Sequence, residues 1–279
     1  MMKITPVAFE SLGVRSMATL VEAGKRVFID PSAALGPLRY GLPPHELELQ
    51  ALTEAKRRIH EIASGCDILI ITHYHFDHHD PGETFYGGKT ILAKDTKNKI
   101  NKSQTERGRY FANQLPEDCK LEYADGREFY FDGLRIRFSP PVPHGPKGIN
   151  LGYVLMCRIE EGGDVLVYSS DVQGPVDEEA TEWIIQARPN LLIMDGPPTY
   201  FLGYKFSVEN MRKAEENLIH IIDETGCEVI LDHHLLRDEK YRERFARVYA
   251  TGKAKSAAEY LGVENRLLEM DRKRLWGGR

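Results

Sequence analysis

The 279-residue sequence has few cysteines, no long apolar run and little excess of one charge. Its four cysteines (Cys66, Cys119, Cys157 and Cys227) are far apart and form no C-x-x-C pair, so we expect reduced thiols in a cytoplasmic protein. No segment approaches the roughly 18 consecutive apolar residues of a membrane span. The N-terminus lacks the apolar core of a signal peptide, and we expect no membrane partner.

The formal net charge of −5 argues against a nucleic-acid binder that works by bulk electrostatics, but it allows a local basic patch. Residues 94–109 are such a stretch, since six basic residues there stand against Asp95 and Glu106. They form either a basic rim for an anionic substrate or a solvated helix face, and we favour the helix face. The basic residues are Lys94, Lys97, Lys99, Lys102, Arg107 and Arg109.

The sequence also lacks an internal repeat, a low-complexity tract and a clear linker, so we expect one domain over residues 1–279. Short strands and amphipathic helices alternate irregularly, which is typical of an α/β domain with two sheets between helices. We expect strands within 4–30 and at 67–72, 90–93, 120–124, 128–131, 134–139, 151–159, 165–168, 191–194 and 228–231. The expected helices lie at 44–63, 104–114, 177–188, 207–224 and 241–260.

A cluster of imidazoles and a carboxylate follows one of these strands directly. The sequence His73-Tyr74-His75-Phe76-Asp77-His78 comes after the apolar run 68–71. Side chains two apart in an extended segment point the same way, so His73 and His75 can share one metal ion. A turn can then swing Asp77 and His78 towards a second ion about 3.5–4 Å away. Histidine and aspartate suit zinc, with iron or manganese as alternatives.

Further acids and histidines recur just past later strand ends. His144 lies in a proline-stiffened loop, where a third ligand for the first metal would be well ordered. Asp171 can bridge two metals with its two carboxylate oxygens, or it can cap the next segment. Either His233 or His234 is the natural last ligand for the second metal. The predicted site lies at one edge of the sheets.

Other residues are candidates for supporting roles. Asp30, Asp195 and Asp232 follow strands and could orient ligand histidines, although a turn aspartate is an equal interpretation for the first two. The aromatic loop 199–206 either walls the substrate site or packs into the core. Its candidate substrate contacts are Tyr200, Tyr204 and Lys205.

The ordered series of a His-x-His-x-Asp-His motif, a histidine, an aspartate and a histidine resembles the metallo-β-lactamase superfamily over roughly residues 4–240. It is most similar to a prokaryotic hydrolase-like branch, not to the antibiotic-degrading enzymes. The resemblance implies an αββα four-layer sandwich. It also implies a first metal on His73, His75 and His144, and a second on Asp77, His78 and His233 or His234, with Asp171 bridging.

The resemblance further implies a metal-dependent hydrolase with two zinc ions that lower the pKa of a bridging water from about 15.7 towards about 7. Asp77 would orient this metal-bound hydroxide or accept a proton. The substrate is expected to be a phosphodiester or nucleic acid, or a small ester, thioester or lactone. A mononuclear iron thiol or persulfide oxygenase and a metal-binding protein without turnover are the alternatives. A homo-oligomer is also compatible with the sequence alone and is kept as one of the expected partners.

Overall fold

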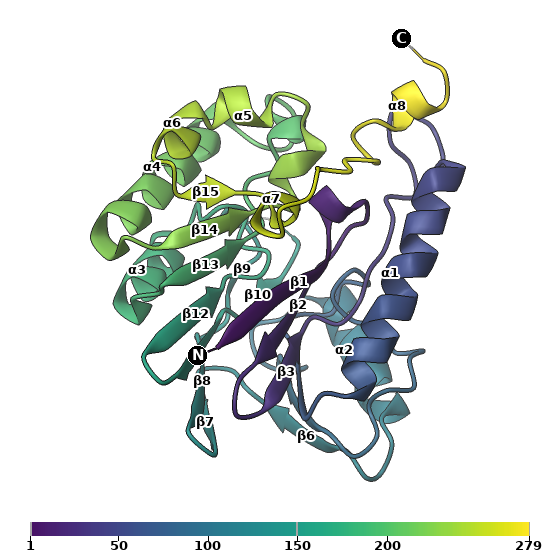
Figure 1. Cartoon of the computed structure of the whole chain (residues 1–279), viewed down its shortest axis with the longest axis vertical. Coiled ribbons are helices and arrows are strands. Elements are labelled where there is room, and N and C mark those ends of the chain that lie inside the picture. Colours follow the sequence, from purple (N-terminus) through teal and green to yellow (C-terminus); the bar gives the residue numbers. More distant parts are fainter. Residues whose placement is uncertain (1, 149, 279) are drawn as a thin grey trace.

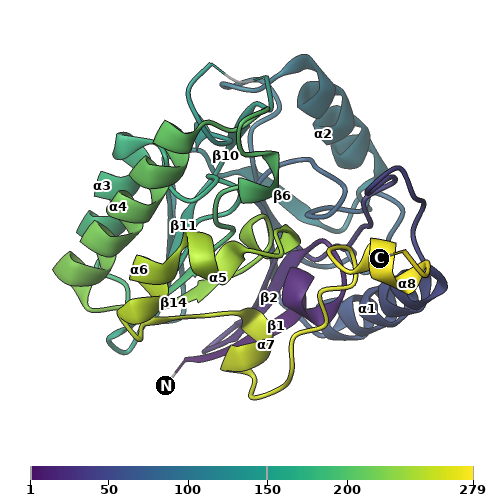
Figure 2. The same cartoon turned by 90° about the horizontal axis from the view of Figure 1, so that it is seen from above.

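Two β-sheets face each other and helices cover their outer faces, as Figures 1 and 2 show. The computed structural model describes residues 2–148 and 150–278. Its four layers confirm the predicted αββα sandwich. None of the helices in these residues has the length and apolarity that crossing a membrane requires.

The first sheet has six strands in the order β1-β2-β3-β4-β5-β6. Strands β3 to β6 run parallel, which requires crossover connections and buries the strands between layers. For this reason β4 is a continuous apolar run with every residue buried. The strands are β1 (Lys3–Phe9), β2 (Met17–Glu22), β3 (Arg26–Ile29), β4 (Ile68–Ile71), β5 (Thr90–Ala93) and β6 (Lys120–Tyr123).

The second sheet has seven strands in the order β15-β14-β13-β12-β11-β8-β7, and β12 to β15 run parallel. A two-stranded ribbon, β9 (Val142–Pro143) with β10 (Tyr153–Val154), lies apart from both sheets. The sheet strands are β7 (Glu128–Phe131), β8 (Leu134–Phe138), β11 (Cys157–Glu161), β12 (Asp164–Tyr168), β13 (Leu191–Met194), β14 (Glu228–Leu231) and β15 (Ala254–Lys255).

Three apolar clusters hold the layers together. One lies between the two sheets and joins side chains such as Ile70 of β4 and Ile193 of β13. A second packs α1 (Glu46–Ser64) and α2 (Lys102–Gln114) against the first sheet. The third packs the second sheet against α3 (Glu178–Ala187), α4 (Val208–Thr225), α5 (Tyr241–Arg244) and α6 (Ala246–Ala250).

Most predicted elements are present, but three predictions were wrong. The strand expected over 151–159 is divided into β10 and β11, which belong to different sheets. The strands expected within 4–30 included residues 7–12, but Glu10–Leu12 forms the 3-10 turn η1. The predicted helix over 241–260 is broken into α5, α6, β15 and α7 (Ala257–Tyr260). Pairing of β15 with β14 and the left-handed φ of 69° at Gly252 interrupt that helix.

Residues 261–278 form a C-terminal strap that runs from α7 to the start of α1 and ends in α8 (Arg272–Leu275), as Figure 1 shows. Arg272 fixes the strap there through two hydrogen bonds to Glu48 of α1, at 2.8 and 2.7 Å. Both side chains are fully buried. The strap therefore connects the helix layer to the sheet edge that bears the candidate site.

Candidate metal centre

The predicted ligands lie at the carboxyl ends of strands from both sheets. His73 follows β4, whereas Asp171 follows β12 and His233 follows β14. Parallel strands of one sheet end at the same edge and the two sheets face each other, so these side chains meet although they are distant in sequence. His144 arrives from the β9–β10 ribbon, whose backbone holds it through its N–H bond to the carbonyl of Gly152.

Asp171 is the centre of the cluster. Its Oδ2 lies 3.3 Å from His144 Nε2 and 3.7 Å from His73 Nε2, and its Oδ1 lies 3.3 Å from His78 Nε2. His233 Nε2 and His234 Nε2 each lie 3.7 Å from Asp171 Oδ2. One carboxylate therefore faces histidines from both halves of the fold.

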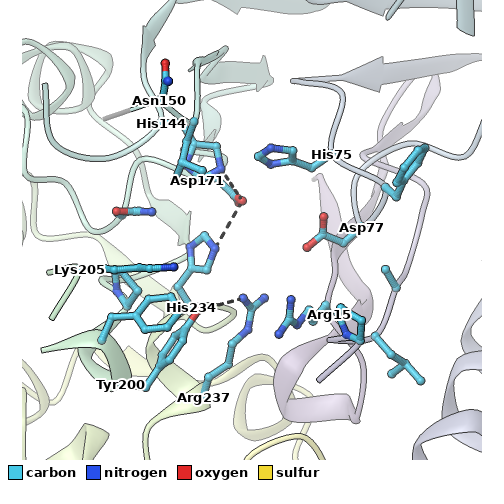
Figure 3. A pocket seen from close by; sticks show the side chains of 18 of the residues that line it. Arg15, His75, Asp77, His144, Asn150, Asp171, Tyr200, Lys205, His234 and Arg237 are labelled. Carbon is cyan, nitrogen blue, oxygen red and sulfur yellow. Dashed lines mark hydrogen bonds and ion pairs between the residues drawn. The ribbon is translucent and has the colours of Figure 1, made fainter. Parts of the chain in front are cut away.

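Two of the groups whose ligand atoms lie within 4.8 Å of one another correspond to the predicted metal sites. One set is His73, His75, His144 and Asp171, which is the predicted first metal site. The other, Asp77, His78 and His233, is the predicted second site. His234 also groups with Asp171 and His233, so the structure brings both candidate last ligands to the cluster. Figure 3 shows His75, Asp77, His144, Asp171 and His234 around one opening.

Several buried polar atoms in this cluster have no hydrogen-bond partner within the described residues. They are His78 Nε2, His144 Nδ1 and Nε2, and Asp171 Oδ1. Burying such groups without a partner is costly, and native proteins rarely do so without a water or an ion. Imidazole nitrogens and carboxylate oxygens that converge without partners fit a transition-metal site.

Two aspartates orient histidine rings from outside the cluster. Asp30 Oδ2 lies 2.8 Å from His78 Nδ1, and Asp195 Oδ2 lies 2.7 Å from His234 Nδ1. A carboxylate at Nδ1 fixes the tautomer that leaves Nε2 free to bind a metal. Asp232 differs, because its carboxylate accepts backbone N–H groups of Ser11, His233 and Ala257 and touches no imidazole.

The electrostatics keep most of the histidines neutral. Burial lowers the pKa of His75 to about 3 and that of His233 to about 4. Burial also lowers the pKa of His73 and His234. Neutral imidazole is the form that binds metal, so these side chains are ready to ligate at neutral pH.

Asp77, His78 and Asp171 are coupled through charge. Burial opposes the protonation of His78, but the carboxylates of Asp171 and Asp77 prevail and raise its pKa well above the ordinary value. Burial also opposes the ionisation of Asp77, yet His78 and His233 lower its pKa. His78 also contributes most to lowering the pKa of Asp171. The carboxylates are therefore ionised and attract positive charge to the site.

Three residues at these strand ends have left-handed backbones. The φ angles are 46° at Asp30, 56° at Ser170 and 49° at His233. Non-glycine residues rarely adopt this conformation, and those that do concentrate at functional sites. The turns hold the adjoining side chains at the mouth of the cluster at a cost in local stability.

A pocket of about 810 Å³ opens over the cluster. Of the predicted substrate residues, Tyr200 and Lys205 line it. Tyr204 is not among the lining residues, and its side chain is largely exposed to solvent. Tyr200 belongs to the 3-10 turn η2 (Thr199–Phe201), which follows β13.

The basic stretch 94–109 is divided by the fold. Lys94 is fully buried and bonds to Asp125 Oδ1 at 2.6 Å, so it belongs to no rim. Arg107 lines the pocket, with its guanidinium 4.6 Å above the Phe76 ring. Lys102 is exposed on α2, as expected for a solvated helix face.

Sequence analysis missed pocket residues that carry positive charge. Arg15 and Arg237 line the pocket, and the Arg237 guanidinium lies 3.2 Å from His233. Arg237 ends η3 (Leu235–Arg237), which directly follows the candidate ligands His233 and His234. This closeness in sequence was the one signal that could have identified Arg237. Arg15 lies in a segment between β1 and β2 with no motif of its own, so only the structure reveals its place.

The chain is similar over nearly its whole length to proteins named UPF0282. It is 45% identical to one from Methanopyrus kandleri, covering 99% of each chain. It is 43% identical to one from Thermococcus gammatolerans, covering 98% of this chain and 95% of the relative. For one from Methanocaldococcus jannaschii the identity is 40%, with 100% and 98% covered. No family model matches the chain.

Solved structures show the same fold at low sequence identity. The metallo-β-lactamase fold protein YhfI from Bacillus subtilis aligns with a TM-score of 0.50 and 17% identity, covering 83% of this chain and 85% of that one. Zn²⁺-bound PqqB from Methylobacterium extorquens aligns with a TM-score of 0.52 and 12% identity, covering 92% and 98%. These likenesses establish the fold alone, and the candidate metal centre is inferred from the arrangement of its own histidines and aspartates.

Proposed function

The chain belongs to the UPF0282 protein family and has the metallo-β-lactamase fold, and from that premise we propose that it is a metal-dependent hydrolase. One observation carries the proposal. Buried histidines from separate strand ends surround Asp171, and ligand atoms of His78, His144 and Asp171 have no partner within the described chain. Leaving such groups buried without partners is costly, which supports a bound cation at this position.

We propose a dinuclear centre with zinc as the metal. The two ligand sets support two ions, and Asp171 would contribute to both, because it belongs to the first set and its Oδ1 lies 3.3 Å from His78 Nε2 of the second. Neutral imidazoles with carboxylates are ligands that zinc prefers in proteins. The fold neighbour PqqB was crystallised with Zn²⁺, but that likeness concerns the fold, so the choice of zinc rests on the ligand chemistry.

Each residue of the site has a role in this proposal. When bound, a metal pair supplies an activated water at neutral pH and polarises the electrophilic group of a substrate. Asp77 lines the pocket with a lowered pKa, so its carboxylate is better suited to orienting the water than to retaining a proton. Asp30 and Asp195 fix the rings of His78 and His234.

The proposed substrates are a phosphodiester, including nucleic acid, or a small ester, thioester or lactone. Activity on bis-p-nitrophenyl phosphate, on p-nitrophenyl acetate and on a lactone separates these classes. RNA binding that weakens steeply with salt would favour nucleic acid, because phosphate contacts release counterions.

Metal analysis of purified variants tests the proposal. We expect about two zinc ions per chain in the wild type and the loss of at least one in His75→Ala and Asp171→Ala. His220→Ala is the matched control, because this histidine is exposed on α4 and belongs to none of the candidate metal groups. Unchanged metal content and activity in Asp171→Ala would remove the proposal.

The same preparations separate the alternatives. Iron in place of zinc, with O₂ consumption on a thiol or persulfide, would identify an oxygenase. Metal that raises the melting temperature without turnover on any substrate would identify a binding protein.

A further inference from the structure

Besides the proposed metal ligands, positively charged side chains line the pocket over the candidate metal centre. Four cationic side chains line it: Arg15, Arg107, Lys205 and Arg237. The carboxylates that line it, Asp77 and Asp171, both belong to the proposed metal ligands. Figure 3 shows the guanidinium groups of Arg15 and Arg237 next to each other, on the opposite side of the opening from His144.

The Arg15 guanidinium is held in place by an ion pair, but only some of its hydrogen-bond donors have a partner. Its Nε and Nη2 each bond to a carboxylate oxygen of Glu269 in the C-terminal strap at 2.5 Å. A guanidinium has five N–H donors, so three remain, and no hydrogen bond within the described residues uses them. The side chain is 23% exposed, at the pocket wall. It therefore has fixed, unused donors facing the cavity.

Arg237 is an almost fully buried cation beside Arg15. Its Nε bonds to Glu10 Oε2 at 2.8 Å, and its Nη1 lies 3.5 Å from the Tyr200 hydroxyl. Two adjacent guanidinium groups at the pocket wall favour the binding of an anion between them.

The remaining two cations lie on aromatic rings at the pocket wall. Arg107 lies 4.6 Å from the Phe76 ring centroid, and Lys205 lies 5.3 Å from that of Phe201. Neither forms an ion pair with a carboxylate in residues 2–148 and 150–278. The pocket wall thus combines positive charge with apolar area. The pocket volume of about 810 Å³ suits a small molecule.

Resting on the proposed hydrolase function, we propose that the substrate is a small molecule with an oxyanion group, a phosphate or a carboxylate, bound by Arg15 and Arg237 beside the metal centre. Lys205 draws the anion into the pocket, and Phe76 and Tyr200 contact the apolar part of the molecule. Planar guanidinium groups match the two oxygens of either oxyanion, which explains the use of arginine at this position.

Calorimetric titration of the metal-loaded, full-length protein with inorganic phosphate tests this inference. The decisive variant is Arg15→Gln combined with Glu269→Gln, because it removes the ion pair without changing the net charge. We expect phosphate to bind about tenfold more weakly, since hydrogen bonds from a charged group are lost. Phosphate bound to the metals alone would be unaffected by this change, so the difference reports on Arg15.

Matched variants make the outcome specific. Arg109→Gln removes an exposed arginine of α2 that does not line the pocket, and it should leave phosphate binding unchanged. Arg15→Lys keeps the charge but loses the planar fork, and an intermediate loss of affinity is expected. If the double variant fails to fold, the lysine variant still decides the question.

Acetate titrated into the wild type distinguishes the two oxyanions. Tighter binding of phosphate supports a phosphorylated substrate, whereas tighter binding of acetate supports a carboxylate. Equal affinities of wild type and the Arg15 variants for both anions would overturn the inference. So would an RNA oligonucleotide that displaces phosphate far more tightly than phosphate itself binds. Absence of turnover would count against the hydrolase proposal and leave this binding result standing.

Discussion

Arg15 and Glu269 are 254 positions apart in the chain and form a two-point ion pair, with both N–O distances at 2.5 Å. The pair joins the C-terminal strap to the wall of the candidate active site. Glu269 is almost fully buried, and Arg15 is mostly so. The far end of the chain thereby determines where a pocket cation lies.

We expect Glu269→Gln to destabilise the protein by about 3 kcal/mol at pH 7, because it leaves a buried arginine without its partner. Burial opposes the ionisation of Glu269, but the Arg15 hydrogen bond and the Arg237 charge lower its pKa from 4.5 to about 2. A lowered pKa in the folded state gives stability that is complete above about pH 4.5 and is lost as pH falls towards 2.

Urea unfolding between pH 7 and pH 3 measures this effect. The wild type should lose more stability over that range than Glu269→Gln, which has no carboxyl group to protonate at this position. Equal pH dependence of the two proteins would contradict the assigned role of the pair.

Gly36 leaves the space that Arg15 occupies. A Cβ at this position would lie 2.2 Å from Arg15 Nη2 and 2.8 Å from Glu269 Oε2. Gly36→Ala should therefore displace the guanidinium and weaken phosphate binding with little change in metal content. Gly41→Ala is a comparison in the same loop, where a Cβ would meet no atom within 4 Å, although its φ of 74° adds backbone strain. If both variants weakened phosphate binding alike, the effect would be one of the loop and not of Arg15.

His233 and His234 should differ in their effect on metal content. His233 shares a ligand set with Asp77 and His78, whereas His234 does not. We therefore expect His233→Ala to lose about one metal ion per chain and His234→Ala to retain both with reduced activity. Mass spectrometry of the purified variants gives the stoichiometry. Loss of a metal in His234→Ala alone would assign the last ligand to His234.

Lys94 should matter for stability and not for the site. The Lys94 ammonium is buried against Asp125 and does not line the pocket. Burial lowers the pKa of Lys94. Lys94→Met should destabilise the fold by about 3 kcal/mol, since Asp125 loses its buried partner. Lys102→Met, at a side chain that is 92% exposed, should change stability by less than about 0.5 kcal/mol. Chemical unfolding compares the two, and equal effects would contradict the buried pair.

The sequence by itself determined the sandwich and the members of the cluster. Short apolar runs bounded by turn residues, such as Ile68–Ile71, are typical of buried strands, and a histidine-rich turn directly after one favours a metal site. The left-handed residues Asp30, Ser170 and His233 could not be foreseen, because their conformation depends on contacts made by the folded strand ends.

Only the tertiary structure decided which charges meet. Arg15, Arg237 and Glu269 belong to no local motif, and Lys94 looked like its neighbours in a basic run until burial separated it from them. Local patterns determine helices and strands because hydrogen bonds and side-chain periodicity act over a few residues. Ion pairs and pockets depend on elements brought together from distant parts of the chain, so their partners become known only once the sheets have packed.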